Sequence, residues 1–329
     1  MTTTTTPPTA AEVPVQKRTS IGKFLVQGGT TIALVLLVLF FFAMRPDVLL
    51  SFTNVRNFLF QVSILAIIAG AQTLVMVVGD FDLSLAATSS PAGSVAASLM
   101  LDGTATLPAI LVALAVGLGV GLANGFLVAY VGLSAFVATL ATMTSVTGLA
   151  YLVTEGTTLF DLPAGFNSLG QGRVLAIPVP VYIAIGLSVV LWALLRFTTT
   201  GRKWYAIGGN VEVSRLSGIN VQRGRLLAFT AAGLISAVGG ILLAARLGSA
   251  SAVQGSETLL FSVAAVFLGM TVIRSGRANL VGTMVGVAII GVMSNGLNIL
   301  GVNSYVQQVV TGLIIIAAVT LSSVRTRER

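Results

Sequence analysis

The sequence contains no cysteine and no histidine. Without cysteine, disulfide bonds, thiol nucleophiles and thiolate metal sites are excluded. Without histidine, the chain lacks the side chain that most often serves as a general base or as a metal ligand. We therefore expect neither catalytic residues nor a metal or cofactor site in this chain, and we do not interpret it as an enzyme.

Charged residues are also scarce. They make up 9% of the 329 residues, whereas 55% of the residues are hydrophobic. A soluble domain carries about 25% charged residues, so the composition is typical of a polytopic helical membrane protein. In a soluble protein the net charge of +8 would suggest a nucleic-acid partner. In a membrane protein, basic cytoplasmic loops set the orientation instead, and we expect no nucleic acid to bind.

What the sequence has in abundance is long apolar stretches. A helix rises 1.5 Å per residue, so roughly 20 apolar residues cross the ~30 Å hydrocarbon core of a bilayer. We predict an all-α fold of about ten transmembrane helices, at Phe24–Met44, Asn57–Val78, Leu83–Leu101, Leu107–Tyr130, Ala135–Val153, Ile177–Phe197, Arg225–Arg246, Thr258–Val272, Ala278–Asn298 and Val302–Ser322. The eighth stretch is short and the third contains Pro91, so either is a candidate for a broken or re-entrant segment.

The distribution of basic residues predicts the orientation. If the N-terminus is cytoplasmic and the stretches alternate, only four of the 18 Lys and Arg residues lie outside, namely Arg45, Arg56, Arg173 and Arg246. This bias follows the positive-inside rule and predicts that both termini are cytoplasmic. Residues 1–20, rich in Thr and Pro, are predicted to be a disordered tail. Residues 21–329 are predicted to form one transmembrane domain with a basic cytoplasmic loop at 198–224.

Glycines recur at helical spacing inside two of the apolar stretches. Gly117, Gly121 and Gly125 are four residues apart, as are Gly282 and Gly286. Small residues at this spacing allow helix backbones to approach closely in lipid. No phosphate-binding G-x-x-x-x-G-K-[ST] string occurs, so we predict that these glycines pack helices together.

The turn between the second and third stretches contains Asp80 and Asp82, followed by Ser84. Ionised groups are costly inside a bilayer, so carboxylates at its edge face a cavity, a partner or the interface. One interpretation is a solvated turn in which Asp82 caps the next helix. The other is that Asp80, Asp82 and Ser84 line or gate a polar path.

The basic loop after the sixth stretch contains signals for a short helix. Asn210 is a good N-cap, Glu212 suits the first turn, and Gly218 suits the position just past the C-terminus. A helix of about two turns is marginal alone, so it should pack against something. Either it rests on its own membrane domain or it docks a cytoplasmic partner.

Three amides lie inside or at the ends of apolar stretches: Asn124, Asn295 and Asn298. Such amides commonly bond across helices. Alternatively, they line a path for a ligand rich in hydroxyls, since amides both donate and accept hydrogen bonds. The pairs Asn124-Gly125 and Asn295-Gly296 lie near the ends of the fourth and ninth stretches. Two stretches that are five apart run in opposite directions through the membrane, so this short similarity is a weak indication of an inverted repeat.

The segment from Gly201 to Ile219 resembles the cytoplasmic loop of the ribose-type sugar permeases of ABC importers. That loop often reads E-A-A-x-x-x-G, and Glu212 and Gly218 match its ends. The turn at Gly79 resembles the family's G-G-I-D-L-S sequence. The segment Gly269 to Ala278 departs from the family's glycine-rich turn, loses several glycines and adds Arg274.

The resemblance implies a permease subunit that imports a monosaccharide or similar small polyol. In the family the cytoplasmic helix couples to an ABC ATPase, which carries over here to Glu212, Arg215, Leu216, Gly218 and Ile219. It also implies that ATP and Mg are bound by that partner ATPase and not by this chain. The other expected partners are an extracytoplasmic substrate-binding protein that docks on outer loops, a second permease subunit (a homodimer is favoured) and the lipid bilayer.

Other substrates and mechanisms stay open at this stage. Permeases for nucleosides, autoinducer-type sugars or branched-chain amino acids share the same general features. An ion-coupled secondary transporter is the alternative from another class. Such transporters place ionisable groups near the middle of their spans, and the predicted spans contain almost none.

Overall fold

The computed structural model describes residues 20–272 and 276–327. The predicted N-terminal tail lies outside the described residues except for Ser20, which begins the first helix. Arg274, the basic residue added in the turn that departs from the family pattern, also lies outside them.

Helices dominate the described residues, and the strands are limited to one two-residue pair, β1 and β2. The elements, in chain order, are α1 (Ser20–Met44), α2 (Pro46–Leu49), α3 (Phe52–Val77), α4 (Ser84–Leu101), α5 (Thr106–Phe126), the π-helical η1 (Leu127–Val131), α6 (Ala135–Thr154), α7 (Ala164–Gln171), β1 (Arg173–Val174), β2 (Ile177–Pro178), α8 (Val179–Phe197), α9 (Thr199–Gly209), α10 (Val211–Leu216), α11 (Val221–Leu247), α12 (Thr258–Gly269), α13 (Leu280–Ile299) and α14 (Ser304–Arg327).

The all-α prediction is confirmed, and each of the ten predicted stretches overlaps one long helix or, at Thr258–Val272, the shorter α12. Among the described residues, six helices are long and apolar enough to cross a membrane: α3, α5 with η1, α6, α8, α11 and α13. Several predicted boundaries differ from the observed ones by a few residues. Ile177 and Pro178 form β2 and not the start of α8, because they pair with β1. The eighth stretch ends its helix at Gly269, so α12 has only 12 residues.

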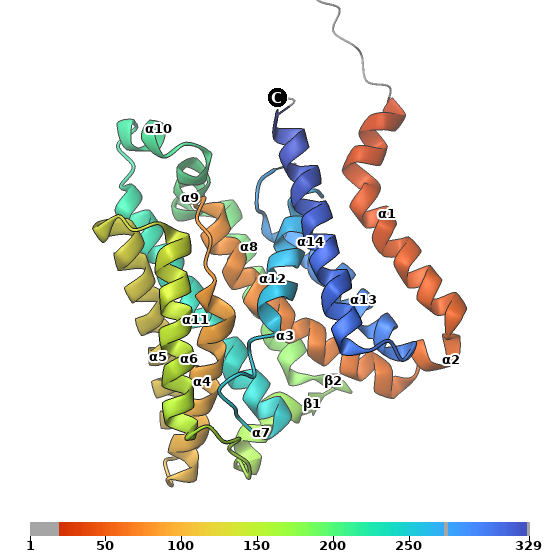
Figure 1. Cartoon of the computed structure of the whole chain (residues 1–329), viewed down its shortest axis with the longest axis vertical. Coiled ribbons are helices and arrows are strands. Elements are labelled where there is room, and N and C mark those ends of the chain that lie inside the picture. Colours follow the sequence, from red (N-terminus) through yellow and green to blue (C-terminus); the bar gives the residue numbers. More distant parts are fainter. Residues whose placement is uncertain (1–19, 273–275, 328–329) are drawn as a thin grey trace, which may run out of the picture.

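The helices run up and down between two ends of the molecule (Figure 1). We call them the α10 end and the α7 end, after the short helix that marks each. α1 begins and α14 finishes at the α10 end, so both ends of the described chain lie on one side. α5 finishes at the α10 end whereas α13 finishes at the α7 end. This opposite direction is what an inverted repeat requires.

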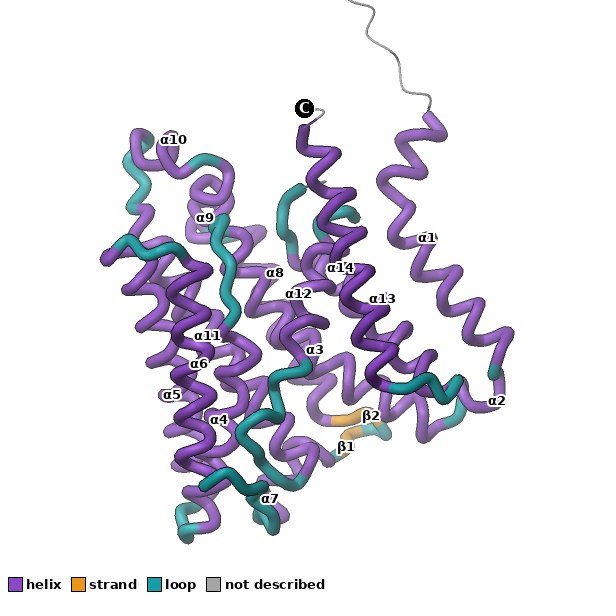
Figure 2. Tube along the Cα trace, in the orientation of Figure 1, coloured by secondary structure: helices purple, strands orange, loops and turns teal. Residues whose placement is uncertain are grey.

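Two non-helical segments enter the bundle lengthwise (Figure 2). Residues 78–83 leave α3 at the α10 end and descend before α4 begins. Residues 248–257 rise from the α7 end to the start of α12. There the Gly255 amide donates to Ser90 Oγ of α4 at 3.0 Å. The predicted irregularity of the third and eighth stretches thus lies before each helix, and α4 itself continues through Pro91.

The predicted glycine packing is confirmed. A Cβ at Gly121 would lie 2.5 Å from the Phe229 carbonyl oxygen, and one at Gly125 would lie 3.0 Å from Leu226 Cα, both on α11. A Cβ at Gly286 would overlap the Ala265 backbone of α12. Backbone contact of this kind holds α5 against α11 and α13 against α12, because side chains at these positions would force the helices apart.

Candidate functional site

A buried polar cluster surrounds Asp82, where the descending segment meets α4. Asp82 Oδ1 accepts hydrogen bonds from the Ser84 amide and from Ser84 Oγ, both at 2.7 Å. Asn124 Nδ2 of α5 donates to Ser84 Oγ at 2.8 Å and to Asp82 Oδ2 at 3.4 Å. Thr142 Oγ1 of α6 donates to Asn124 Oδ1 at 2.6 Å. We call these four residues the Asp82 cluster; they tie α4, α5 and α6 together.

The solvated-turn interpretation is wrong for Asp82, whose exposed fraction is 0%. Its proposed capping role is confirmed in part, because its carboxylate accepts from the Ser84 amide in the first turn of α4. A buried carboxylate needs such donors, since an unpaired buried charge is costly. The structure therefore brings three of the predicted path residues, Asp82, Ser84 and Asn124, into one network.

Asp80 lies apart from that network. Its Oδ2 is 2.9 Å from Arg225 Nε at the start of α11, and its side chain is 9% exposed. Burial raises the pKa of the Asp80 carboxyl to about 6, and the Arg225 charge offsets part of this rise. Asp80 is located in the loop after α3, and its ion pair with Arg225 holds that loop against the N-terminal part of α11.

The same loop contacts α9 through two glycines. Gly79 has φ +88°, a conformation that favours glycine, and a Cβ on it would lie 3.3 Å from Gly208 Cα. A Cβ on Gly208 would overlap the Val77 carbonyl oxygen at the end of α3. α9 is further held by Trp204 and Ile207, which are 2% and 1% exposed. The basic loop is therefore firmly packed on the membrane domain and directly adjoins the segment that leads to Asp82.

The short helix predicted in the basic loop is confirmed as α10. Asn210 Oδ1 accepts from the Val213 amide at 3.0 Å, as an N-cap should. Gly218 follows the helix with φ +77°. The predicted coupling residues divide between two faces: Ile219 packs against the core, whereas Glu212 and Arg215 pair at 3.1 Å in solvent, and Leu216 is 87% exposed.

The two remaining predicted amides lie near the α7 end. Asn295 is 7% exposed, and its Nδ2 donates to Asn54 Oδ1 of α3 at 3.2 Å. Asn298 Oδ1 accepts from Gln307 Nε2 of α14 at 2.8 Å. Asn295 therefore joins helices, as the packing interpretation predicts.

Asn298 lines a polar cavity of about 360 Å³ between α3, α12, α13 and α14. We call it the Gln307 pocket. Its walls present amides, hydroxyls and one carboxylate, supplied by Gln61, Ser256, Glu257, Ser294, Asn298, Ser304, Gln307, Gln308 and Thr311. Several are already bonded to each other, since Gln61 Nε2 donates to Ser294 Oγ at 3.2 Å. The pocket can donate and accept hydrogen bonds from several directions.

Sequence reasoning missed Arg225, Thr142, Gln61 and Gln307. A signal existed for the two glutamines, because each is a polar side chain inside an otherwise apolar stretch. The partners of Asp80 and Asn124 had no such signal, since Arg225 begins a predicted stretch and Thr142 is one of several threonines inside another. Among the described residues, no three His, Cys, Asp or Glu side chains gather in a way that could hold a metal ion.

Comparison with known proteins places the chain among transport permeases. The family model for the branched-chain amino acid transport system / permease component matches residues 54–319. The ribose import permease protein RbsC of Bacillus subtilis (strain 168) is 41% identical over 308 residues, which cover 93% of this chain and 95% of that protein. The D-allose transport system permease protein AlsC of Escherichia coli (strain K12) is 32% identical, with 94% and 96% covered. The L-arabinose transport system permease protein AraH of the same organism is 35% identical, with 82% of each covered. No solved structure matches significantly.

Proposed function

Because the chain belongs to the family of branched-chain amino acid transport system permease components, we propose that it is the membrane permease subunit of an ATP-driven importer for a monosaccharide. The observation that carries this function is that ribose, allose and arabinose permeases match it over four fifths or more of its length. A sugar is favoured over a branched-chain amino acid because these relatives are named for sugars. The protein is a transport permease and not an enzyme.

The α10 end is the cytoplasmic side in this proposal. The four basic residues assigned outside, Arg45, Arg56, Arg173 and Arg246, lie at or near helix ends or turns that point toward the α7 end (Figure 1). The basic segment around α9 and α10 lies at the opposite end. Both termini are then cytoplasmic and ten helices enter the membrane, with α12 reached through the non-helical segment 248–257.

The energy for transport comes from a separate ABC ATPase that docks on α10. Leu216 and Val213 are 87% and 57% exposed on this helix, beside the Glu212–Arg215 pair. Exposed apolar side chains with charged neighbours are typical of a protein contact. α9 is packed against the end of α3 through Gly208. A displacement of α10 by the ATPase would therefore be transmitted through α9 to the segment 78–83 and to the Asp82 cluster.

The extracellular partner is a substrate-binding protein that delivers the sugar at the α7 end. The loop from 155 to 178 contains α7 and the β1–β2 hairpin there, and Phe160 and Leu175 are 62% and 89% exposed on it. Two permease subunits, in the simplest case two copies of this chain, complete the pathway. ATP and Mg belong to the ATPase.

The Gln307 pocket is the best candidate for a sugar-contacting surface. Its amides and hydroxyls can exchange their mutual hydrogen bonds for bonds to sugar hydroxyls at little net cost. The Asp82 cluster is the alternative predicted path region, but Asp82, Ser84 and Asn124 are almost fully buried and bonded to each other, which favours a structural or gating role.

The test is uptake by proteoliposomes that contain the permease, its ATPase and its binding protein, with radiolabelled ribose, arabinose and allose as probes. We expect ATP-dependent uptake of at least one sugar that survives collapse of the ion gradients. Gln307→Leu should lower uptake, whereas Thr320→Val, a hydroxyl on the same helix that bonds only to its own backbone, should not. Uptake that needs an ion gradient and no ATPase would refute the proposal.

A further inference from the structure

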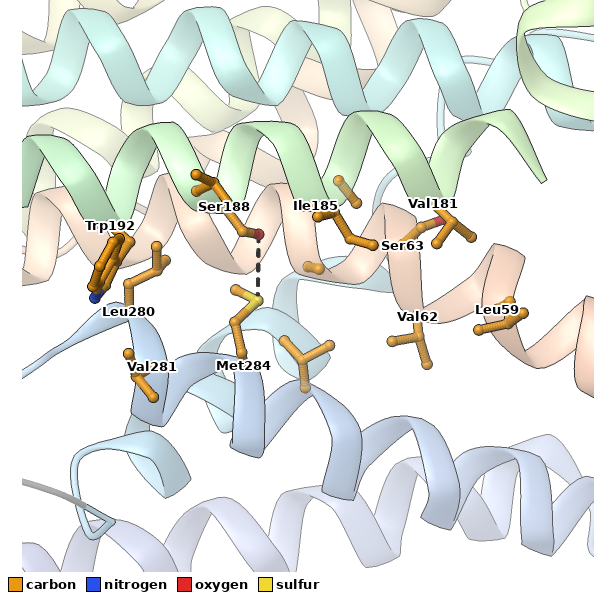
Figure 3. A pocket seen from close by; sticks show the side chains of 14 residues that line it. Leu59, Val62, Ser63, Val181, Ile185, Ser188, Trp192, Leu280, Val281 and Met284 are labelled. Atoms are coloured by element: carbon orange, nitrogen blue, oxygen red, sulfur yellow. Dashed lines mark hydrogen bonds between the residues drawn. The ribbon is translucent and has the colours of Figure 1, made fainter. Parts of the chain in front are cut away.

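An apolar groove and a basic pocket adjoin each other on one flank of the bundle. The groove, of about 410 Å³, lies between α3, α8 and α13 (Figure 3). The basic pocket, of about 590 Å³, lies between the end of α8, α9 and the start of α13. Trp192, Leu280 and Val281 line both. The two hollows therefore form one continuous surface that runs along α8 toward the cytoplasmic side.

The groove offers hydrocarbon and almost no hydrogen bonds. In Figure 3 the side chains of Val62, Ile185 and Met284 point into it from its three helices. Its two hydroxyls are already used: Ser63 Oγ donates to the Phe60 carbonyl at 2.8 Å, and Ser188 Oγ donates to Met284 Sδ at 3.5 Å. A sugar would lose its hydrogen bonds here, so the occupant must be apolar.

The groove runs along most of α8 and opens outward. Ile185 and Val189 on its rim are 58% and 54% exposed. Val181 and Trp192 mark its ends on α8, eleven residues apart, which corresponds to about 16 Å along a helix. Because Val181 lies near the first end of α8 and Trp192 nearer its last, an acyl chain that starts beside Trp192 and follows the groove crosses the middle of the membrane.

The basic pocket continues the groove at the level of the head groups. Among the residues that the structure describes, its charged lining residues are Arg196 and Arg202, and none of its lining residues is acidic. Arg202 Nη1 donates to the Phe197 carbonyl at 3.3 Å, which leaves its other guanidinium donors for a ligand. Trp192, at the junction, is 42% exposed, and tryptophan at such a level is typical of the membrane interface.

We propose that this surface is a binding site for an anionic phospholipid of the cytoplasmic leaflet. The phosphate lies between Arg196 and Arg202, and one acyl chain lies in the groove. Charge complementarity selects an acidic lipid, since basic pockets between helices on the cytoplasmic side bind such head groups. The proposal rests on the orientation given above, in which the α10 end is cytoplasmic.

The experiment measures retained lipid by native mass spectrometry of the permease–ATPase complex, after exchange into mixed phosphatidylglycerol and phosphatidylcholine micelles. We expect the wild type to retain phosphatidylglycerol preferentially. Arg196→Gln/Arg202→Gln should weaken retention tenfold or more, because it removes charge-assisted hydrogen bonds to the phosphate that only residues lining the pocket can make. Lys203→Gln/Arg223→Gln, which removes two exposed charges from the same end but outside the pocket, should leave retention unchanged.

Two further variants separate the parts of the site. Arg196→Lys/Arg202→Lys keeps the charge and should keep most of the lipid. Ser188→Phe fills the groove and should reduce retention of both lipids while the basic pocket is intact. If Arg196→Gln/Arg202→Gln fails to fold, the single variants Arg196→Gln and Arg202→Gln test the head-group selectivity in its place, and Ser188→Phe tests the acyl-chain groove.

Three results would overturn the proposal: equal retention of phosphatidylglycerol by the arginine variants and their controls, displacement of the lipid by inorganic phosphate, or conversion of a dimer to monomers by Ser188→Phe. The last would mean that a second copy covers the groove. None of these results would contradict the proposed function. That function is tested separately, by measuring ATP-dependent sugar uptake in phosphatidylcholine vesicles.

Discussion

Gly208 of α9 lies against the Val77 carbonyl at the end of α3, so closely that no side chain fits between them. This contact joins the loop that contains α9 and α10 to the helix that precedes Asp80 and Asp82. It is a backbone contact, and it cannot adapt by changing a rotamer. A displacement of α9 must therefore move the end of α3, the segment 78–83, or both.

Adding one methyl group at Gly208 should disturb this contact. Gly208→Ala should destabilise the permease by about 1–3 kcal/mol through overpacking, and it should lower sugar-stimulated ATPase activity more than ATPase binding. Gly209→Ala is the matched control, because a Cβ there meets only Arg277 Nη2 at 3.7 Å. Thermal unfolding in detergent and ATPase assays of the complex measure both effects. If Gly208→Ala and Gly209→Ala had the same unfolding temperature and the same ATPase activity, the close contact between Gly208 and Val77 would not matter for stability or coupling.

Replacing Leu216 should uncouple the ATPase without unfolding the permease. Leu216→Asp places a charge at an 87% exposed position, so the unfolding temperature should not change, since surface substitutions usually cost less than about 0.5 kcal/mol. Affinity for the ATPase should fall by tenfold or more, or about 1.4 kcal/mol. Leu175→Asp, at an 89% exposed position near the opposite end, is the control. Unchanged ATPase affinity in Leu216→Asp would place the docking surface elsewhere.

Gly218→Arg tests the end of the same helix. The φ of +77° is unfavourable for any residue with a Cβ, although no atom lies within 4 Å of a Cβ placed there. We expect a misplaced α10, little change in overall stability, and loss of uptake. Full uptake by Gly218→Arg would contradict the coupling assignment. The control is Ser217→Arg, which adds the same charge at the exposed neighbouring residue without requiring a positive φ.

Removing the amide of Asn124 should be costly. Asn124→Leu leaves the Asp82 carboxylate, the Ser84 hydroxyl and the Thr142 hydroxyl with one partner fewer. Each buried group left unpaired costs about 1–3 kcal/mol, so we expect a clear fall in the unfolding midpoint in sodium dodecyl sulfate titrations. Thr144→Val, an exposed hydroxyl that bonds only to its own helix at 3.3 Å, should change the midpoint little. A similar small change for Asn124→Leu would argue against the network.

Asp80 should contribute a pH dependence to folding. Its pKa is raised from 3.8 to about 6 in the folded protein, so between these values the folded state binds more protons than the unfolded chain. Stability from this group therefore falls as the pH rises from about 4 to about 6, and it levels off above that. Above pH 6 the ionised carboxylate pairs with Arg225. Asp80→Asn should remove this contribution, which appears as the difference between the two unfolding curves measured from pH 4 to pH 8. Parallel curves would refute the assignment.

Much of the fold was predictable because bilayer physics acts on local sequence. The length of apolar runs sets helix positions, and the glycine spacing in 117–125 predicts a close helix contact. The cap at Asn210 and the glycine at 218 predict α10 for equally local reasons. Even so, the helix that these glycines contact, α11, is about a hundred residues away in the chain. The spacing of the glycines does not predict which helix that is.

The sequence predicted most of the polar residues of the candidate site, but it did not predict which of them contact one another. Asp80 and Asp82 are two residues apart and look equivalent in the sequence. In the structure one pairs with Arg225 of α11 and the other with Ser84 and Asn124, because the non-helical segment 78–83 carries the two carboxylates past different helices, which the sequence spacing does not reveal. Asn295 and Asn298 likewise look like one helix face, but Asn295 bonds α3 while Asn298 bonds Gln307.

The sequence by itself determined that this protein is helical and enters a membrane, because uninterrupted apolar runs of roughly 20 residues match a helix that crosses the hydrocarbon core with its backbone groups paired internally. It also determined where the short exposed helix α10 lies. Only the tertiary structure decided which polar side chains meet, where the Gln307 pocket and the groove along α8 lie, and that Gly208 touches α3. Those features depend on contacts between residues far apart in the chain, which no local preference specifies.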